Sequence, residues 1–142
     1  MADQLDRETY DAVMSLLRAD TGPPALVVYP NTEGLVPTNP APPYIRVYFS
    51  LERPPDAAGN ALKGTSTTWT ARFYIHCVGA NEYSTIATAM RVNRALMDVR
   101  PTVTGRTCGP IRLEASSPPH RDETTGTLVQ DRTDVYRMIS YG

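Results

Sequence analysis

The fold of this chain is decided by residues 68–79, which read TWTARFYIHCVG. Apolar and polar side chains alternate along this stretch, and a period of two is typical of a β-strand with one buried face. The predicted core face carries Trp69, Ala71, Phe73, Ile75 and Cys77. The opposite face carries Thr70, Arg72, Tyr74 and His76, and the strand ends at Gly79-Ala80-Asn81.

A helix is predicted directly after this strand, from about Glu82 to Val99, with Asn81 or Ser84 as its N-cap and a stop before Pro101. Helical periodicity places an apolar stripe on one face, made of Ile86, Ala89, Met90, Asn93, Leu96 and Met97. The opposite face is predicted to hold Thr88, Arg91, Ala95 and Asp98. Asn93 interrupts the stripe, and we expect its amide to bond a nearby backbone group.

The N-terminal half predicts one more helix and two more strands. A broad apolar face predicts a helix from about Asp3 to Arg18, which Thr21-Gly22-Pro23-Pro24 ends. A short buried strand is expected over Ala25–Tyr29, followed by an extended, proline-rich connection to Pro43. Tyr44 to Leu51 alternates again, with one face formed by Ile45, Val47, Phe49 and Leu51 and the other by Arg46, Tyr48 and Ser50.

The C-terminal part predicts two further strands separated by a polar loop. After a turn or short strand at Thr102–Gly105, an alternating strand is expected with Ile111, Leu113 and Ala115 on one face. The polar loop is Ser116–Gly126, and Thr133–Tyr141 closes the sheet. Either Val135 and Ile139 or Tyr136 and Met138 form the buried face of that last strand, and a strand apolar on both faces is usually central.

This order of elements predicts an α+β fold, in which two main α-helices pack on a mainly antiparallel β-sheet. The length of 142 residues suits a single domain over residues 1–142, with long loops at about 30–43, 52–67 and 116–128. Residues 52–67 are far longer than the two to five residues that a hairpin needs. They form either a disordered surface insertion or a long hairpin arm that orders against a neighbouring subunit.

Composition and motifs exclude several functions. The net charge of −1 leaves no electrostatic footprint for nucleic acid, and no apolar run approaches the roughly 20 residues that span a bilayer. The polar, acidic N-terminus predicts that the protein stays in a cytoplasm, where disulfides are rare, so no disulfide is predicted between its two cysteines, Cys77 and Cys108. Two thiols are too few for a zinc site unless both histidines join them, and no metal site is predicted.

No catalytic or cofactor-binding motif is found, so neither an enzyme nor a cofactor is predicted. The one cluster with suitable residue types is Ser116, Ser117, His120 and Asp122, which lies in a single polar loop. A nucleophile and its base need a rigid scaffold, which such a loop does not supply.

Local charge is uneven, because five arginines between Arg91 and Arg112 are accompanied by only one acid, Asp98. Four acids (Asp3, Asp6, Glu8 and Asp11) concentrate in the first predicted helix. A basic and an acidic flank suit head-to-tail contacts between copies, which close into rings, although the charge pattern alone favours ordinary surface charge. Eight tyrosines against two phenylalanines favour surfaces that a partner buries.

Several segments in order resemble the tail terminator (tail-completion) proteins of long, non-contractile-tailed bacteriophages of the siphophage type. The resemblance covers about Leu5 to the end, and its segments are Val28-Tyr29-Pro30, His76-Cys77-Val78-Gly79, Ala95-Leu96-Met97, Arg100-Pro101-Thr102-Val103-Thr104-Gly105-Arg106, Cys108-Gly109-Pro110, Arg121-Asp122 and Asp134-Val135-Tyr136-Arg137. None of these is a catalytic signature, and the proline-rich connection and residues 52–67 are not matched.

The resemblance implies a structural protein that is assembled in the host bacterial cytoplasm and acts at the tail–neck junction of the virion. Such proteins form a homohexameric ring that caps the head-proximal end of the tail tube, ends its polymerisation and docks the head-completion (stopper) protein. Double-stranded DNA passes through the lumen without sequence-specific binding, and neither a membrane nor a cofactor is involved. Two alternatives stay open: another neck or tail-tube component, and a small ligand-binding domain or enzyme.

Ten residues are expected at subunit or partner contacts. They are Arg53, Asp56, Lys63, Trp69, Arg72, Tyr74, Arg91, Arg106, Arg121 and Asp122.

The length of the predicted arm yields a first testable prediction. Deleting Asp56 to Lys63 should leave the fold intact but weaken assembly, because the deletion shortens a connection and touches no predicted core strand. Circular dichroism checks the fold and native mass spectrometry checks the assembly. A deletion variant that assembles like the parent protein would rule out the arm as a subunit contact.

Overall fold

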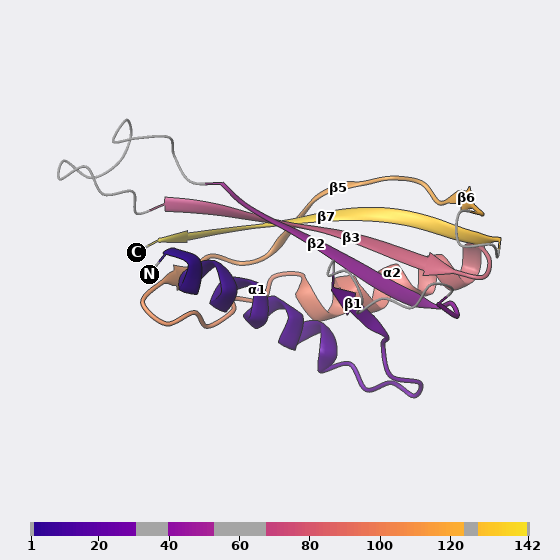
Figure 1. Cartoon of the computed structure of the whole chain (residues 1–142), viewed down its shortest axis with the longest axis horizontal. Helices are drawn as coiled ribbons and strands as arrows, with labels where there is room; N and C mark the ends of the chain where they lie inside the picture. Colours follow the sequence, from indigo (N-terminus) through magenta and orange to yellow (C-terminus); the bar gives the residue numbers. More distant parts are fainter. Residues whose placement is uncertain (1, 31–39, 53–67, 124–127, 142) are drawn as a thin grey trace.

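The computed structural model describes residues 2–30, 40–52, 68–123 and 128–141, and these form a twisted seven-stranded sheet with two helices against one face (Figure 1). The elements in chain order are α1 (Ala2–Arg18), β1 (Val28–Pro30), β2 (Tyr44–Glu52), β3 (Thr68–Gly79), α2 (Glu82–Leu96), β4 (Thr107–Cys108), β5 (Arg112–Ser116), β6 (His120–Asp122) and β7 (Val129–Tyr141). The predicted α+β fold with a mainly antiparallel sheet is confirmed.

Strand β7 pairs with more strands than any other strand of the sheet. Its thirteen residues pair with β3 along one edge, over twelve consecutive residue pairs from Thr68↔Tyr141 to Gly79↔Gln130. Its other edge is shared in succession by β4, β5 and β6. On the far side of β3 the sheet continues through β2 and ends at β1, which is parallel to β2, whereas the other pairings are antiparallel.

The core lies between the sheet and the helices, and it confirms the faces predicted for β2 and β3. Phe73 and Ile75 on β3 and Ile45 and Val47 on β2 are fully buried. Of the two pairs that the sequence offered for the buried face of β7, Tyr136 and Met138 are buried and Val135 and Ile139 are half-buried, which decides between the two faces. The two helices supply Val13, Met14 and Leu17 from α1 and Ala89, Val92 and Leu96 from α2.

The buried face of α2 matches the predicted stripe only at Ala89 and Leu96. The helix buries Thr85, Thr88, Ala89, Val92 and Leu96, while Met90 is 59% exposed. Two threonines replace the expected apolar residues because their hydroxyls are satisfied within the helix. Thr85 donates to the Asn81 carbonyl at 2.9 Å and Thr88 to the Ser84 carbonyl at 2.8 Å, which leaves their methyl groups for the core.

The structure defines both ends of α2 and the partner of Asn93. Asn81 is the N-cap and accepts a hydrogen bond from the Ser84 amide at 2.8 Å. The helix ends at Leu96, three residues before the predicted end, and Asp98 adopts a positive φ of 64° after the C-cap. Asn93 donates to the Tyr136 hydroxyl at 3.2 Å, so the prediction of a backbone partner was wrong.

Three further expectations are corrected along the sheet edges. Strand β1 is shorter than predicted and half-buried. All five residues of β5 are exposed, because β5 is an edge strand with a register shift between Leu113 and Ala115. The predicted polar loop after residue 116 contains a strand, since His120–Asp122 pairs with Val129–Asp131.

Most of the predicted arm and of the proline-rich connection lies outside the described residues, at 53–67 and 31–39. The two strands that flank the arm nevertheless form the predicted antiparallel pair, in register from Tyr44↔Val78 to Glu52↔Thr70.

The observed face of α2 predicts opposite outcomes for two truncations. Leu96→Ala should lower the free energy of unfolding by about 2–5 kcal/mol, because it opens a cavity in the core. Met90→Ala should change it by less than about 0.5 kcal/mol, because Met90 faces outward and alanine favours the helix. Urea unfolding of the monomer measures both, and equal losses would contradict the orientation of α2.

Candidate interaction surface

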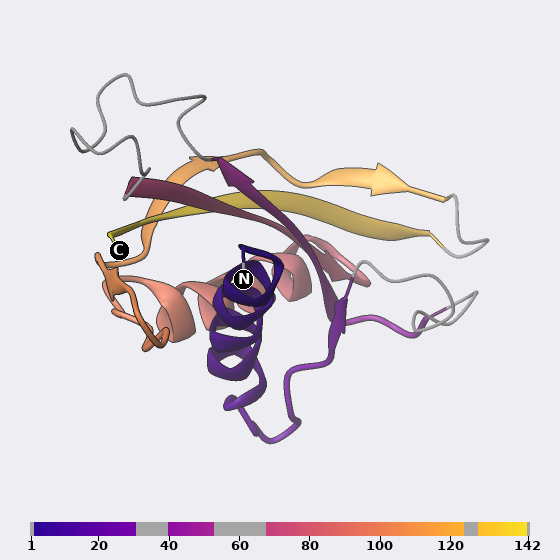
Figure 2. The same cartoon turned by 60° about the vertical axis from the view of Figure 1, so that its left-hand side comes forward.

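The face of the sheet opposite the helices carries no helix of the described residues (Figure 2). The register places alternate side chains of β2, β3 and β7 in rows across this face, which we call the open face. One row runs Tyr48, Tyr74, Val135, and the next runs Ser50, Arg72, Arg137. Tyr74 is 36% exposed, and exposed tyrosines and arginines are typical of surfaces that bind other proteins.

Arg72 is fixed at the middle of the open face by two carboxylates. Its Nη1 donates to Glu52 on β2 at 2.6 Å, and its Nε donates to Glu114 on β5 at 3.0 Å. These hydrogen bonds, first to Glu114 and then to Glu52, raise the pKa of Arg72. The guanidinium therefore ties together β2, β3 and β5 and carries little free charge to a partner.

A second cluster lies further along the same face, around His76. Its Nδ1 lies 3.1 Å from the Asp131 carboxylate and 3.2 Å from the Thr133 hydroxyl. The Tyr48 ring meets the imidazole edge-on at a centroid distance of 5.2 Å, and the Arg46 guanidinium lies 5.8 Å from the centre of that tyrosine ring. These contacts hold the side chains in a fixed arrangement, and they confirm the predicted outward position of His76.

Trp69 and Arg106, both predicted contact residues, lie together at the start of β3. The Arg106 guanidinium lies 3.8 Å from the centre of the Trp69 ring, and its Nη2 donates to the Ser140 carbonyl at 2.9 Å. Trp69 is only 7% exposed, so it packs within the subunit. The cation–π contact attaches the segment before β4 to the start of β3, and the hydrogen bond to Ser140 attaches it to the end of β7.

Arg91 serves a contact within the subunit. Its Nε and Nη2 each donate to the Asp20 carboxylate at 2.8 Å, and Nη2 also reaches the Pro24 carbonyl at 2.8 Å. The bidentate pair anchors the turn after α1 to the side of α2, and it lowers the pKa of Asp20. Arg112 is similarly paired with Asp98. Four of the five arginines predicted to form a basic flank, Arg91, Arg100, Arg106 and Arg112, thus bond groups of their own chain.

The remaining predicted contact residues are divided between β6 and the segment outside the described residues. Arg121 and Asp122 lie on β6, where Arg121 is exposed and pairs with Glu123 at 3.5 Å. Arg53, Asp56 and Lys63 fall within 53–67 and lie outside the described residues. The structure therefore brings Arg72 and Tyr74 together on one surface and places Trp69, Arg91 and Arg106 in internal contacts.

The cluster of serine, histidine and aspartate residues has the geometry of a strand connection. The Ser116 hydroxyl donates to Asp134 at 2.6 Å, and the Ser117 hydroxyl accepts the Thr133 amide at 3.0 Å. Both hydroxyls thereby fix the β5–β6 connection to β7. Cys77 is fully buried on the apolar face, and burial raises the pKa of its thiol, which disfavours the reactive thiolate.

Two negative findings concern the described part of the chain. Its histidines, cysteines, aspartates and glutamates form no group of three that could hold a metal ion. None of its helices has the length and apolar character needed to cross a bilayer.

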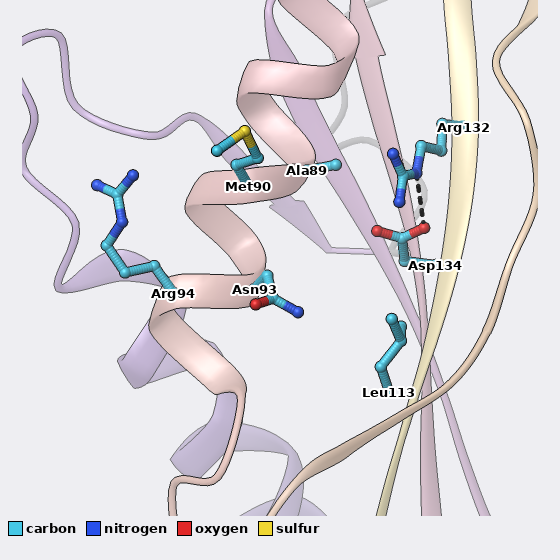
Figure 3. Close-up of a pocket in the computed structure, with 7 residues that line it drawn as sticks. All are labelled: Ala89, Met90, Asn93, Arg94, Leu113, Arg132 and Asp134. Carbon is cyan, nitrogen blue, oxygen red and sulfur yellow. Dashed lines mark hydrogen bonds and ion pairs between the residues drawn. The ribbon is translucent and has the colours of Figure 1, made fainter.

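A shallow groove beside α2 was not expected from the sequence (Figure 3). It is lined by Ala89, Met90, Asn93, Arg94, Leu113, Arg132 and Asp134. Ala89 and Asn93 point from α2 toward the strands, and Leu113 comes from β5 on the other side (Figure 3). Arg132 is neutralised by the buried Asp134 at 2.9 Å. The exposed Met90 and Leu113 give the groove its apolar character. The sequence already placed Met90 in the apolar stripe predicted for this helix, but as a residue facing the core.

Comparison with known proteins identifies solved structures with the same fold. One is a chain of the virion of a native gene transfer agent particle, which is 20% identical, has a TM-score of 0.68 and is matched over 93% of both chains. A second is 14% identical with a TM-score of 0.65, over 94% of this chain and 96% of that chain. No protein-family model and no curated protein sequence matches.

The Asp20–Arg91 pair predicts a measurable pH dependence. Because the folded-state pKa of Asp20 is below its ordinary value of 3.8, the pair stabilises the fold above that pH and loses its effect as pH falls through the folded pKa. Arg91→Met should raise the pKa of Asp20, seen by NMR titration, and lower the melting temperature at pH 7. The difference in melting temperature between the variant and the parent protein should shrink in acid. A difference that stays the same in acid would contradict the stabilising role of the Asp20–Arg91 pair.

Proposed function

We propose that this protein is a structural component of a virion, and that within the virion it is the tail terminator. In this proposal a homohexameric ring caps the head-proximal end of the tail tube, ends tube polymerisation and docks the head-completion (stopper) protein. The observation that carries the proposal is the common fold with a gene transfer agent virion chain over 93% of both chains. The TM-score of that match is 0.68.

The sequence resemblance to tail terminators of siphophages supports the finer part of the proposal. A gene transfer agent particle is phage-like, so the sequence and the fold point to the same class of particle. One line of support rests on short segments of sequence and the other on the arrangement of the strands.

The surface chemistry also suits a structural role without catalysis or cofactor. The serine hydroxyls that resembled a catalytic cluster bond Asp134 and the Thr133 amide, and so hold the sheet together. The open face instead offers tyrosine and arginine side chains fixed by neighbours, which lose little conformational entropy when a partner covers them.

Double-stranded DNA would pass through such a ring, and the placement of the arginines fits that passage. Arg72, Arg91 and Arg112 are each paired with carboxylates of their own chain. The net charge of the chain is −1. Weak, sequence-independent attraction lets DNA move through a lumen, whereas a strongly basic lining would retain it.

Assembly with the tail-tube protein tests the proposal. Native mass spectrometry of the protein alone and with its tube protein should give a six-fold species, or monomers that become a six-fold cap on tube ends. Negative-stain electron microscopy should then show tubes of limited length with one capped end. Long open tubes containing this chain would identify it as a tube subunit, and a strict monomer that ignores the tube would overturn the terminator assignment.

A further inference from the structure

The sheet has two edges without a strand partner among the described residues, and they are unlike each other. Strand β1 pairs only with Ile45–Val47, so Tyr48–Glu52 of β2 is open on that side. At the far side of β7, β5 pairs with β7 alone, so Arg112–Ser116 is open on its outer side. Each open stretch is five residues long. Unlike edges on one subunit are the requirement for a head-to-tail contact.

The geometry points to a seam between copies, in which β5 of one subunit pairs with Tyr48–Glu52 of the next. This inference rests on the proposed ring and names the contact that closes it. The occupant of each edge is therefore a second copy of this chain.

Strand direction favours this seam. In one copy β2 is antiparallel to β3, β3 to β7 and β7 to β5, so β2 and β5 run in opposite directions. Rotation about an axis along the strands leaves their directions unchanged. In a ring whose axis lies along the strands, β5 of one copy and β2 of its neighbour would therefore meet as an antiparallel pair, with short, well-aligned hydrogen bonds.

The free backbone groups select the register of the seam. The Ile45 amide donates to Val27 on the β1 side, and alternate residues of a strand point the same way, so the amides of Phe49 and Leu51 point to the open edge. On β5 the Ser117 amide donates to Thr133 on β7, which leaves that of Ser116 pointing outward. The Ile111 amide donates to the Val99 carbonyl, away from β7. The amide of Leu113, two residues further along, points to the same outer side.

These directions fit one register, in which Leu51 pairs with Leu113 and Phe49 pairs with Ser116. In this register the outward-pointing amides and carbonyls of Leu51 and Leu113 hydrogen-bond to each other, and so do those of Phe49 and Ser116. This fit needs the β-bulge between Leu113 and Ala115. At the bulge, Glu114 and Ala115 of β5 together lie opposite the single residue Ser50 of β2, so that Ser50 faces Ala115. A bulge also bends its strand, which suits closure of a ring.

Side chains agree with the same register. Leu113 lies on the helix face of the sheet, opposite Tyr136, and Leu51 lies on the helix face of β2. Their pairing would cover the exposed Leu113 at the groove beside α2 (Figure 3). On the open face Glu52 would lie opposite Arg112, a favourable pair of charges. Two β5 edges related by a two-fold axis at Glu114 would instead place like charges opposite each other, which disfavours a closed dimer.

A disulfide across the seam tests this register. Ser50 and Ala115 are exposed and would form a non-hydrogen-bonded pair, whose Cα atoms lie about 4.5 Å apart, within the range for a disulfide. Under mild oxidation of assembled rings, S50C/A115C should give a ladder of linked chains on a non-reducing gel. A mixture of the two single variants should stop at dimers, and each single variant alone should give none.

The matched control is S50C/L113C, which places the two thiols on opposite faces of the seam and should not link. The native Cys77 and Cys108 are buried, and the parent protein under the same oxidation is the control for any linkage through them. As a second measurement, hydrogen exchange at the Phe49 and Leu51 amides should slow at least about tenfold when the parent protein assembles.

Rings that assemble but show neither the ladder nor the amide protection would overturn the seam and leave the terminator proposal standing. A parent protein that forms no ring with the tube protein would overturn both. Linked dimers from one single variant alone would show that the same edge of two copies meets, which would contradict the head-to-tail contact and indicate a two-fold contact.

Discussion

The pairing of β3 with β7 is the constraint on which the rest of the structure depends. Twelve consecutive residue pairs join the two strands, and they fix which side chains face the helices and which face the open side. On the helix side, β3 and β7 bury Phe73, Ile75, Tyr136 and Met138. A shift by one residue would exchange the two faces and place Arg72 and His76 in the core. The open face and the core are therefore two consequences of one register.

The sequence predicted the elements whose periodicity is unambiguous and failed where polar atoms find partners within the chain. Alternation identified the faces of β2 and β3, because apolar side chains recur at every second residue of both strands. The face of α2 was mispredicted because hydropathy treats Thr85 and Thr88 as polar, although both donate to carbonyls one turn earlier. Strand β6 was missed because His120–Asp122 is held by pairing with β7, and its composition is that of a loop.

Among the predicted contact residues, the sequence placed the exposed side chains and could not identify their partners. Arg72 and Tyr74 were assigned to the polar face of β3 from alternation alone, which the structure confirms. The partners of Arg72, however, are Glu52 and Glu114, which are 20 and 42 residues away in the chain. Arg91 reaches Asp20 over 71 residues. Ion pairs of this kind follow from the tertiary fold, so charge patterns along the chain overestimated the basic flank.

The internal use of these arginines bears on how such a subunit selects its partners. Side chains that are neutralised within the chain offer little long-range attraction, so the proposed assembly depends on surfaces that must fit at short range. Backbone edges meet that requirement, because hydrogen bonds of a strand pair form only in the correct register and direction. Edges that are short and differ from one another also limit indiscriminate pairing. A ring built in this way would close on copies of itself while remaining electrostatically weak toward the DNA that passes through it.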